Sequence, residues 1–180
     1  MKSDAALLVI DMQLCAFDGK ITPPIFEGDK ILNIVGTLID DCRTFGLPII
    51  FIQTCAVSGR PYAKDSHGWE IHPELKKKPT DPVIYKTQSS AFEDTKLVSA
   101  LSELGISKLI TCGIWSEYCL ANTSLDALNL DYSVTVVADA HSTVADTNIG
   151  AMQTVAEQND RLAKNGARLL NASEIIQALR

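Results

Sequence analysis

Short apolar runs recur along the chain and alternate with longer amphipathic segments. The runs are continuous, as in strands that a parallel sheet buries on both faces, rather than strictly alternating between apolar and polar positions. They predict strands at residues 5–10, 48–52, 83–85, 108–112 and 133–138, with a weaker one at 168–170.

The segments between these runs carry a helical pattern. Apolar residues recur at helix spacing in residues 31–39, with Gly46 as the stop, and in residues 97–104 before Gly105. Further helices are predicted at residues 119–130 and 147–164, and a short C-terminal helix opened by Ser173. Six strand–helix repeats predict one α/β domain, residues 1–180, folded as a Rossmann-like three-layer αβα sandwich. The sheet is expected to be mostly parallel, with right-handed crossovers.

One long irregular stretch, residues 54–82, interrupts the regular alternation and is rich in Gly, Pro, His and charge. Loops of this length in a compact domain are usually functional. We expect this one to form a wall of a binding site. His67, Trp69 and His72 lie within it, and packing or surface roles are the favoured interpretation for all three.

Composition and charge exclude several classes of protein. The formal net charge of −6 argues against nucleic-acid binding, which needs a clustered basic face, and the lysines at 76–78 are interpreted as a solvated patch. No apolar window approaches the ~20 residues of a membrane span, and the first residues lack the long apolar stretch of a signal peptide. The five cysteines are an odd number without C-x-x-C spacing, which fits reduced thiols. We expect a cytoplasmic protein with no membrane partner.

Three reactive side chains follow predicted strands. Asp11 closes the first strand, Lys86 closes the third, and Cys119 comes six residues after Gly113, which closes the fourth. Ligands bind parallel sheets at the carboxyl ends of the strands, so all three are expected at one edge. A thiol at a helix start and next to a lysine is predicted to have a lowered pKa. Asp11 could then accept the thiol proton and return it to a leaving group.

At these residues the sequence resembles the isochorismatase-like family of cysteine hydrolases. The resemblance covers nearly the whole chain and has four parts. They are Leu-Val-Ile-Asp-Met-Gln at 8–13, Lys86 with Ser-Ala-Phe at 90–92, Gly-Ile-Trp-Ser-Glu-Tyr-Cys at 113–119, and Asp-Ala-His-Ser-Thr at 139–143. The last of these is expected to follow the fifth strand.

The resemblance implies a catalytic triad of Asp11, Lys86 and Cys119. It also implies a cis peptide between Ile114 and Trp115, which would aim the backbone N–H groups of Trp115 and Cys119 at a substrate oxygen. It implies no cofactor, a small-molecule substrate and a homo-oligomer, either a dimer or a tetramer. The residues expected to bind substrate are Gln13, Phe17, Phe92, Trp115 and Tyr118.

Two departures from the family pattern narrow these expectations. Nicotinamidases follow their second strand with an Asp-x-His motif that helps to bind a metal, whereas residues 53–57 here read Gln-Thr-Cys-Ala-Val. His72 alone makes a poor metal site. No catalytic metal is predicted, and nicotinamide is disfavoured as the substrate. The second departure is conservative, with Ser116-Glu117 standing where Thr-Asp is frequent.

Three functions remain open at this point. The first is amide hydrolysis through Cys119, on a small amide, ureide or lactam. The second is isochorismatase-type cleavage of a vinyl ether with Asp11 as the acid, which Cys119 argues against because such members carry no cysteine there. The third is a catalytically silent, oligomeric binding protein, which the intact triad argues against.

Overall fold

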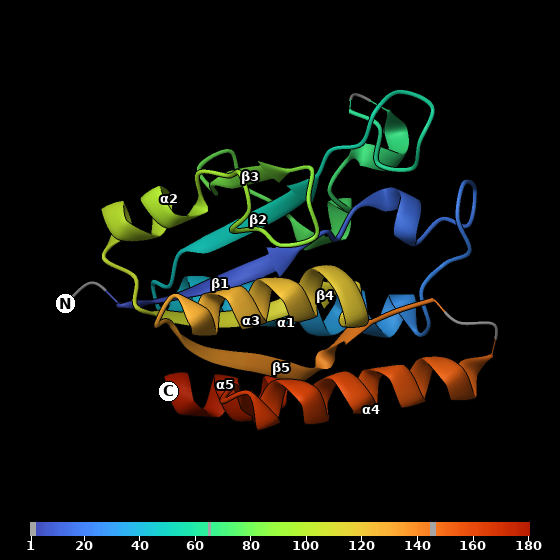
Figure 1. The fold of residues 1–180 in the computed structure, drawn as a ribbon. Coiled ribbons are helices and arrows are strands. Elements are labelled where there is room, and N and C mark those ends of the chain that lie inside the picture. Colours follow the sequence, from blue (N-terminus) through green and yellow to red (C-terminus); the bar gives the residue numbers. More distant parts are fainter. Residues whose placement is uncertain (1–2, 65, 145–146) are drawn as a thin grey trace.

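The computed structural model describes residues 3–64, 66–144 and 147–180. Its six strands form one sheet in the order β3-β2-β1-β4-β5-β6, and every pairing is parallel, where the sequence predicts a mostly parallel sheet (Figure 1). The α/β sandwich predicted from the sequence is confirmed. The strands are β1 (Ala5–Ile10), β2 (Ile49–Thr54), β3 (Val83–Lys86), β4 (Lys108–Ile114), β5 (Ser133–Ser142) and β6 (Arg168–Leu170).

Helices cover both faces of the sheet. One face carries α1 (Gly28–Thr44) and α5 (Ala172–Leu179), and the other carries α2 (Leu97–Leu104), α3 (Ala121–Asn129) and α4 (Asn148–Lys164). Figure 1 shows α3 in front of the sheet and α1 behind it. Leu8 and Val9, successive residues of β1, pack into the two opposite cores and are both fully buried. Because both sides of the strand are covered, its sequence is a continuous apolar run.

Several predicted boundaries differ from those observed. The fifth strand continues to Ser142, so the segment expected after it forms its last residues. The helix predicted at 119–130 is present as α3 but begins at Ala121, because residues 116–120 form a π-helical turn, η4 (Ser116–Leu120). Asn171, rather than Ser173, caps the C-terminal helix, because its side chain and that of Glu174 form a reciprocal capping box.

The long stretch between β2 and β3 is tied to the residues that follow β1. It contains two short 3-10 helices, η2 (His67–Trp69) and η3 (Pro73–Leu75). The His72 N–H donates to the Met12 carbonyl across 2.9 Å, and the Leu14 N–H donates to the Glu70 carbonyl across 2.9 Å. The loop is thereby fixed beside the carboxyl end of β1.

Trp69 and His72 in this loop make contacts with neighbouring residues. Trp69 stacks on Tyr85, with ring centroids 5.8 Å apart, and its indole N–H donates to the Cys55 sulfur across 3.3 Å. The imidazole of His72 accepts a hydrogen bond from the Glu74 N–H across 3.4 Å.

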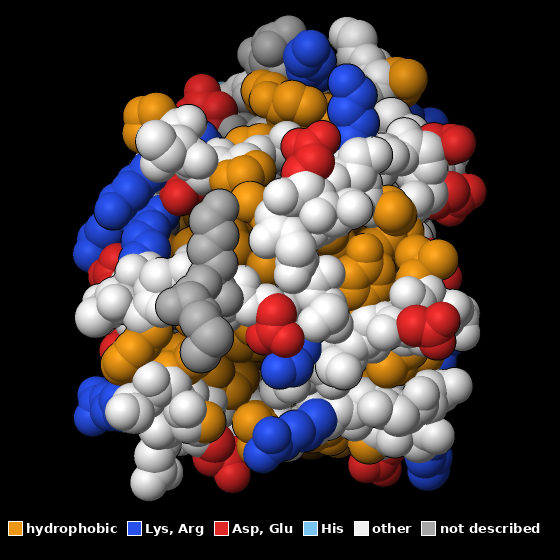
Figure 2. Space-filling model, turned by 90° about the vertical axis from the view of Figure 1, so that its left-hand side faces the viewer, with side chains coloured by type: hydrophobic (Ala, Val, Ile, Leu, Met, Phe, Trp, Pro, Cys, Tyr) orange, Lys and Arg blue, Asp and Glu red, His pale blue; other side chains and the backbone are white. Residues whose placement is uncertain are grey.

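The opposite side of the molecule, where the strands begin, has mixed charge. Figure 2 shows acidic and basic side chains interspersed with apolar ones on this face. Within the described part of the chain, no helix combines the length and the apolar character needed to cross a membrane.

Candidate active site

The three side chains predicted to share one edge of the sheet lie together. Asp11 directly follows β1, Lys86 ends β3, and Cys119 lies in η4, which follows β4. The Lys86 ammonium nitrogen is 2.9 Å from Asp11 Oδ2 and donates to the Cys119 sulfur across 3.3 Å. An ammonium therefore bridges a carboxylate and a thiol at the carboxyl ends of the strands.

All three N–H donors of Lys86 have acceptors. Besides Asp11 and Cys119, the ammonium donates to the Gln88 carbonyl across 2.9 Å, and only 3% of the residue is exposed. Burial lowers the pKa of Lys86, but the charges and hydrogen bonds of Asp11 and Cys119 outweigh it, so the pKa is raised above its ordinary value. Lys86 is therefore a permanent cation at this site and not a base.

The Asp11 carboxylate is held by a partner that the sequence analysis missed. Thr54, the last residue of β2, donates its hydroxyl to Asp11 Oδ2 across 2.9 Å. β2 lies between β1 and β3, so Thr54 stands between the strands that supply Asp11 and Lys86. In the sequence, the position of Thr54 at the end of a predicted strand was the feature that could have indicated this role. Asp11 Oδ1 is buried and has no hydrogen-bond partner among the described residues.

The expectation of a lowered pKa for Cys119 is wrong. Burial, followed by the Asp11 carboxylate, raises the pKa of the thiol to about 12, and Lys86 offsets only part of this effect. Moreover, Cys119 lies inside the π-helical turn rather than at the first residue of a helix. At neutral pH the resting side chain is a thiol, so nucleophilic attack requires a base that removes its proton.

The backbone before Cys119 is unusual. The peptide between Ile114 and Trp115 is cis, as the resemblance implies, and the Trp115 N–H makes no backbone hydrogen bond with the described residues. Gly113 has a φ of +116°, and a Cβ on it would lie 2.1 Å from the Ile10 carbonyl oxygen. Only glycine fits where β4 approaches the end of β1 so closely.

Gln13, predicted to bind substrate, is fully buried and already engaged. Its amide nitrogen donates to the carbonyls of Thr54 and Trp69 across 3.0 and 2.7 Å, and its amide oxygen accepts from the Thr54 N–H across 2.9 Å. Gln13 thus fixes the long loop against the end of β2. These hydrogen bonds hold the backbone of Thr54, the residue that donates to Asp11.

The other predicted pocket residues lie in different surroundings. Phe17 is half-buried and meets His72 edge to face, with centroids 5.1 Å apart, whereas Phe92 tilts against Tyr132 at 5.8 Å. Trp115 is half-buried against the core on the α1 side. Tyr118 is 60% exposed on the surface of the turn that carries Cys119.

Tyr62 is a second residue that the sequence analysis missed. Its hydroxyl is buried and has no hydrogen-bond partner among the described residues. Burial, and then the charges of Cys15 and Asp11, raise the pKa of Tyr62, while the Trp115 side chain offsets part of this effect. A buried hydroxyl without a partner costs free energy unless something binds it. Its only signal in the sequence was its place in the long loop.

Within the described ranges, no group of three or more His, Cys, Asp or Glu side chains is arranged so that it could hold a metal ion.

Comparison with known proteins shows the family of this chain. The family model described as the Isochorismatase domain matches residues 5–172. The chain belongs to the isochorismatase family. This isochorismatase-family chain is 34% identical over 138 residues to a streptothricin hydrolase from Streptomyces noursei, which covers 77% of this chain and 49% of that protein. It is 30% identical over 175 residues to nicotinamidase from Escherichia coli (strain K12), covering 74% and 81% of the two chains.

The family fold extends over the whole domain. An isochorismatase structure from Pseudomonas putida KT2440 has a TM-score of 0.88 at 28% identity, covering 97% of this chain and 91% of the other. The isochorismatase-family chain spans about half the length of the streptothricin hydrolases that it matches.

Proposed function

We propose that this protein is a metal-independent cysteine hydrolase that cleaves a C–N bond of a small amide, ureide or lactam through a thioester on Cys119. The observation that carries the proposal is the Lys86 ammonium, which bridges the Asp11 carboxylate and the Cys119 sulfur at 2.9 and 3.3 Å. Relatives named streptothricin hydrolase and nicotinamidase support a hydrolytic activity of this kind.

In the first half of the reaction, the Cys119 sulfur attacks the substrate carbonyl carbon while the thiol proton moves to Asp11. The S–C bond forms, and the π electrons of the carbonyl move onto its oxygen. The C–N bond then breaks as Asp11 returns the proton to the leaving nitrogen. Because burial and Asp11 raise the pKa of the thiol, transfer of its proton must accompany the attack.

In the second half, water attacks the thioester carbonyl and gives a proton to Asp11. The C–S bond breaks, the acid leaves, and the Cys119 sulfur takes up the proton. Lys86 stays protonated throughout and stabilises the sulfur whenever it carries negative charge.

The developing oxyanion needs hydrogen-bond donors. We assign this role to the Trp115 N–H, which makes no backbone hydrogen bond within the described structure, and to the Cys119 N–H. Removal of one such donor typically costs about 3 kcal/mol of transition-state stabilisation.

Substrate contacts are assigned to the side chains around the three central residues. Tyr62 offers a buried hydroxyl without a partner, which suits a polar group of the substrate. Phe17, Phe92, Trp115 and Tyr118 remain the proposed apolar contacts, while Gln13 acts through Thr54.

The test is hydrolysis of a panel of small amides, ureides and lactams by the wild type and by Cys119→Ala. Cys55→Ala is the matched control, because Cys55 is the other half-buried cysteine. We expect turnover in the wild type and in Cys55→Ala, with a loss on the order of 10⁴-fold or more in Cys119→Ala. Hydrolysis that survives in Cys119→Ala would reject the thioester.

Two further outcomes would replace the proposal. Release of pyruvate from isochorismate by both the wild type and Cys119→Ala would establish vinyl ether cleavage with Asp11 as the acid. Absence of turnover, combined with a Cys119 thiol that is inert to alkylation at every pH, would indicate a binding protein.

We also propose that the chain acts as a homo-oligomer. Tyr118 on η4 is 60% exposed, and α4, which contacts η4, exposes Ile149 and Met152 at 70% and 59%. Large apolar side chains at such exposure fit a surface that another copy covers. Light scattering coupled to size exclusion measures the assembly, and a monomer at micromolar concentration would contradict the proposal.

A further inference from the structure

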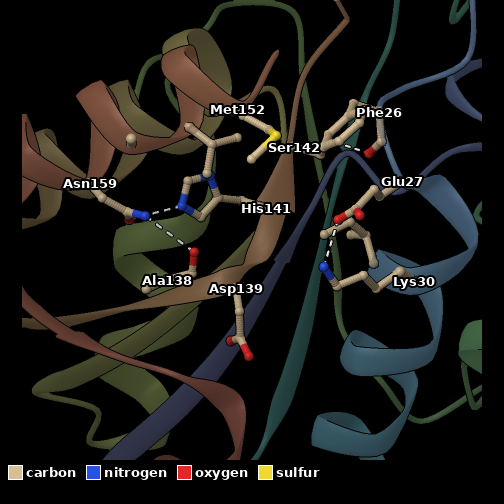
Figure 3. Close-up of a pocket in the computed structure, with 12 residues that line it drawn as sticks. Phe26, Glu27, Lys30, Ala138, Asp139, His141, Ser142, Met152 and Asn159 are labelled. Atoms are coloured by element: carbon tan, nitrogen blue, oxygen red, sulfur yellow. Dashed lines mark hydrogen bonds and ion pairs between the residues drawn. The ribbon is translucent and has the colours of Figure 1, made fainter. Parts of the chain in front are cut away.

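A buried hydrogen-bonded chain that the proposed mechanism does not use leads from α4 to the turn that holds Cys119. His141 on β5 is 2% exposed and Ser116 is fully buried. The Ser116 hydroxyl lies 2.9 Å from His141 Nδ1, and His141 Nε2 lies 3.0 Å from Asn159 Oδ1. Figure 3 shows Asn159 reaching from α4 toward both His141 and Ala138.

The direction of each hydrogen bond follows from Asn159. Its amide nitrogen donates to the Ala138 carbonyl across 3.2 Å, so its oxygen must accept from His141 Nε2–H. Burial lowers the pKa of His141, and a neutral imidazole protonated on Nε2 has an acceptor at Nδ1. The Ser116 hydroxyl therefore donates to His141. The hydrogen bonds all run in one direction, from Ser116 through His141 to Asn159 and the Ala138 carbonyl.

One end of this hydrogen-bonded series lies where β5 extends beyond its pairing with β6. β6 pairs with β5 only at residues 135–137, so among the described residues no strand pairs with the last residues of β5, including Ala138 and His141, on that side. Asn159 satisfies the free Ala138 carbonyl and joins β5 to α4. A pocket of about 250 Å³ lies directly beside His141 and Asn159, between α1 and α4 (Figure 3).

The other end of the hydrogen-bonded series is Ser116, next to the Trp115 N–H that is proposed as an oxyanion donor. Ser116 directly follows Trp115 and begins the turn that contains Cys119. We propose that Asn159, His141 and Ser116 are positioning residues that hold the Trp115 N–H toward the substrate oxygen during acylation of Cys119. The inference rests on the proposed nucleophile, and it assigns these three residues a role without contact with the substrate.

The experiment compares two reagents on Cys119. p-Nitrophenyl acetate acetylates a thiol through a tetrahedral oxyanion with loss of p-nitrophenolate. Iodoacetamide alkylates it by direct displacement of iodide, without an oxyanion. Both rates are measured by mass spectrometry of the Cys119 peptide in a Cys55→Ala background.

Paired variants separate the hydrogen bond from the shape of the side chain. Ser116→Ala removes the donor and Ser116→Thr keeps it. His141→Asn keeps an acceptor at the Nδ1 position, whereas His141→Gln keeps only a group at the Nε2 position.

We expect acetylation to fall about 10- to 100-fold in Ser116→Ala and His141→Gln, since a misplaced donor loses much of the stabilisation that an oxyanion hole supplies. Alkylation should stay within about twofold of the wild type. Ser116→Thr and His141→Asn should recover most of the acetylation rate. Should Ser116→Ala fail to fold, the two His141 variants make the same comparison.

The inference is overturned by unchanged acetylation in Ser116→Ala, by an equal fall in both reactions, or by a wild-type Cys119 that p-nitrophenyl acetate does not acetylate. Failure of the proposed function is a separate result. Acetylation that depends on Ser116, in an enzyme that cleaves none of the amides, would reject the substrate class and leave the positioning role intact.

Discussion

Lys86 donates a hydrogen bond to the Cys119 sulfur across 3.3 Å, although the two residues lie 33 positions apart and on opposite sides of β1 in the sheet order. The contact sets a permanent cation beside a thiol whose own pKa is raised. At neutral pH Cys119 is therefore protonated, and the pKa of its thiol depends on the balance between Lys86 and Asp11.

That balance predicts opposite effects of two substitutions on thiol alkylation. Asp11→Asn removes the negative charge that raises the pKa of Cys119, so alkylation by iodoacetamide at pH 8 should become faster even though turnover is lost. Lys86→Ala removes the cation that lowers this pKa, so alkylation should become slower. Rates measured from pH 6 to pH 11 show the direction in which each substitution moves the titration of the thiol. Equal profiles in all three would contradict the proposed coupling.

Thr54 should matter through its hydrogen bond to Asp11. Thr54→Val has nearly the same shape but cannot donate, and we expect kcat to fall about tenfold, as for the loss of a hydrogen bond to a charged group. Thr54→Ser keeps the donor and serves as the control. The prediction fails if the Ser and Val variants have the same kcat.

Substitution of Tyr62 should affect stability and substrate binding in opposite ways. Tyr62→Phe removes a buried hydroxyl that has no partner, so the free energy of unfolding should rise by about 1 kcal/mol. The same change should raise KM, because a polar group of the substrate loses its partner. Urea denaturation and steady-state kinetics measure the two effects. A decrease in stability would show that the hydroxyl is bonded within the protein.

Gly113 should tolerate no side chain. In Gly113→Ala the new Cβ would lie 2.1 Å from the Ile10 carbonyl oxygen at a φ of +116°, and we expect a loss of about 3 kcal/mol or more. Gly46 has a φ of +74° with open space around it, so Gly46→Ala should cost only about 1 kcal/mol. Thermal or urea unfolding of the two variants measures the difference. Equal losses of stability would show that the backbone moves to remove the clash between the new Cβ and the Ile10 carbonyl oxygen.

His141 should make stability depend on pH. Burial lowers the pKa of His141 in the folded state, while Asn159 and Asp139 offset part of the effect. Below the ordinary value of about 6.5 the unfolded chain binds a proton that the folded chain does not, so the free energy of unfolding should fall as the pH decreases from 7 to 5.5. Its slope should approach, at most, about 1.4 kcal/mol per pH unit.

Other charged groups border the same pocket, namely Asp139 on β5 and the Glu27–Lys30 ion pair on α1. His141→Asn is therefore the control, because it removes the titrating group and leaves these charges in place. Stability of this variant should lose most of its pH dependence between pH 7 and 5.5, and the remainder belongs to His72, whose pKa burial also lowers. A slope equal to that of the wild type would assign the effect to the other groups.

Much of the fold could be predicted from the sequence because the signals are local. The boundaries predicted for the first and last strands are those observed, since apolar side chains are needed on both faces of a buried strand. Gly105 ends α2 in the left-handed conformation that the pattern indicates. The shared position of Asp11, Lys86 and Cys119 followed from the geometry of any parallel sheet.

By itself, the sequence determined the layers of this protein and the edge at which its reactive groups lie, because hydrophobic periodicity and strand ends are properties of neighbouring residues. Only the tertiary structure decided how those groups behave. The pKa of Cys119, the support of Asp11 by Thr54, the free hydroxyl of Tyr62 and the chain through His141 all depend on burial and on contacts between distant segments. Desolvation and charge interactions act through space, so the order of residues along the chain does not encode them directly.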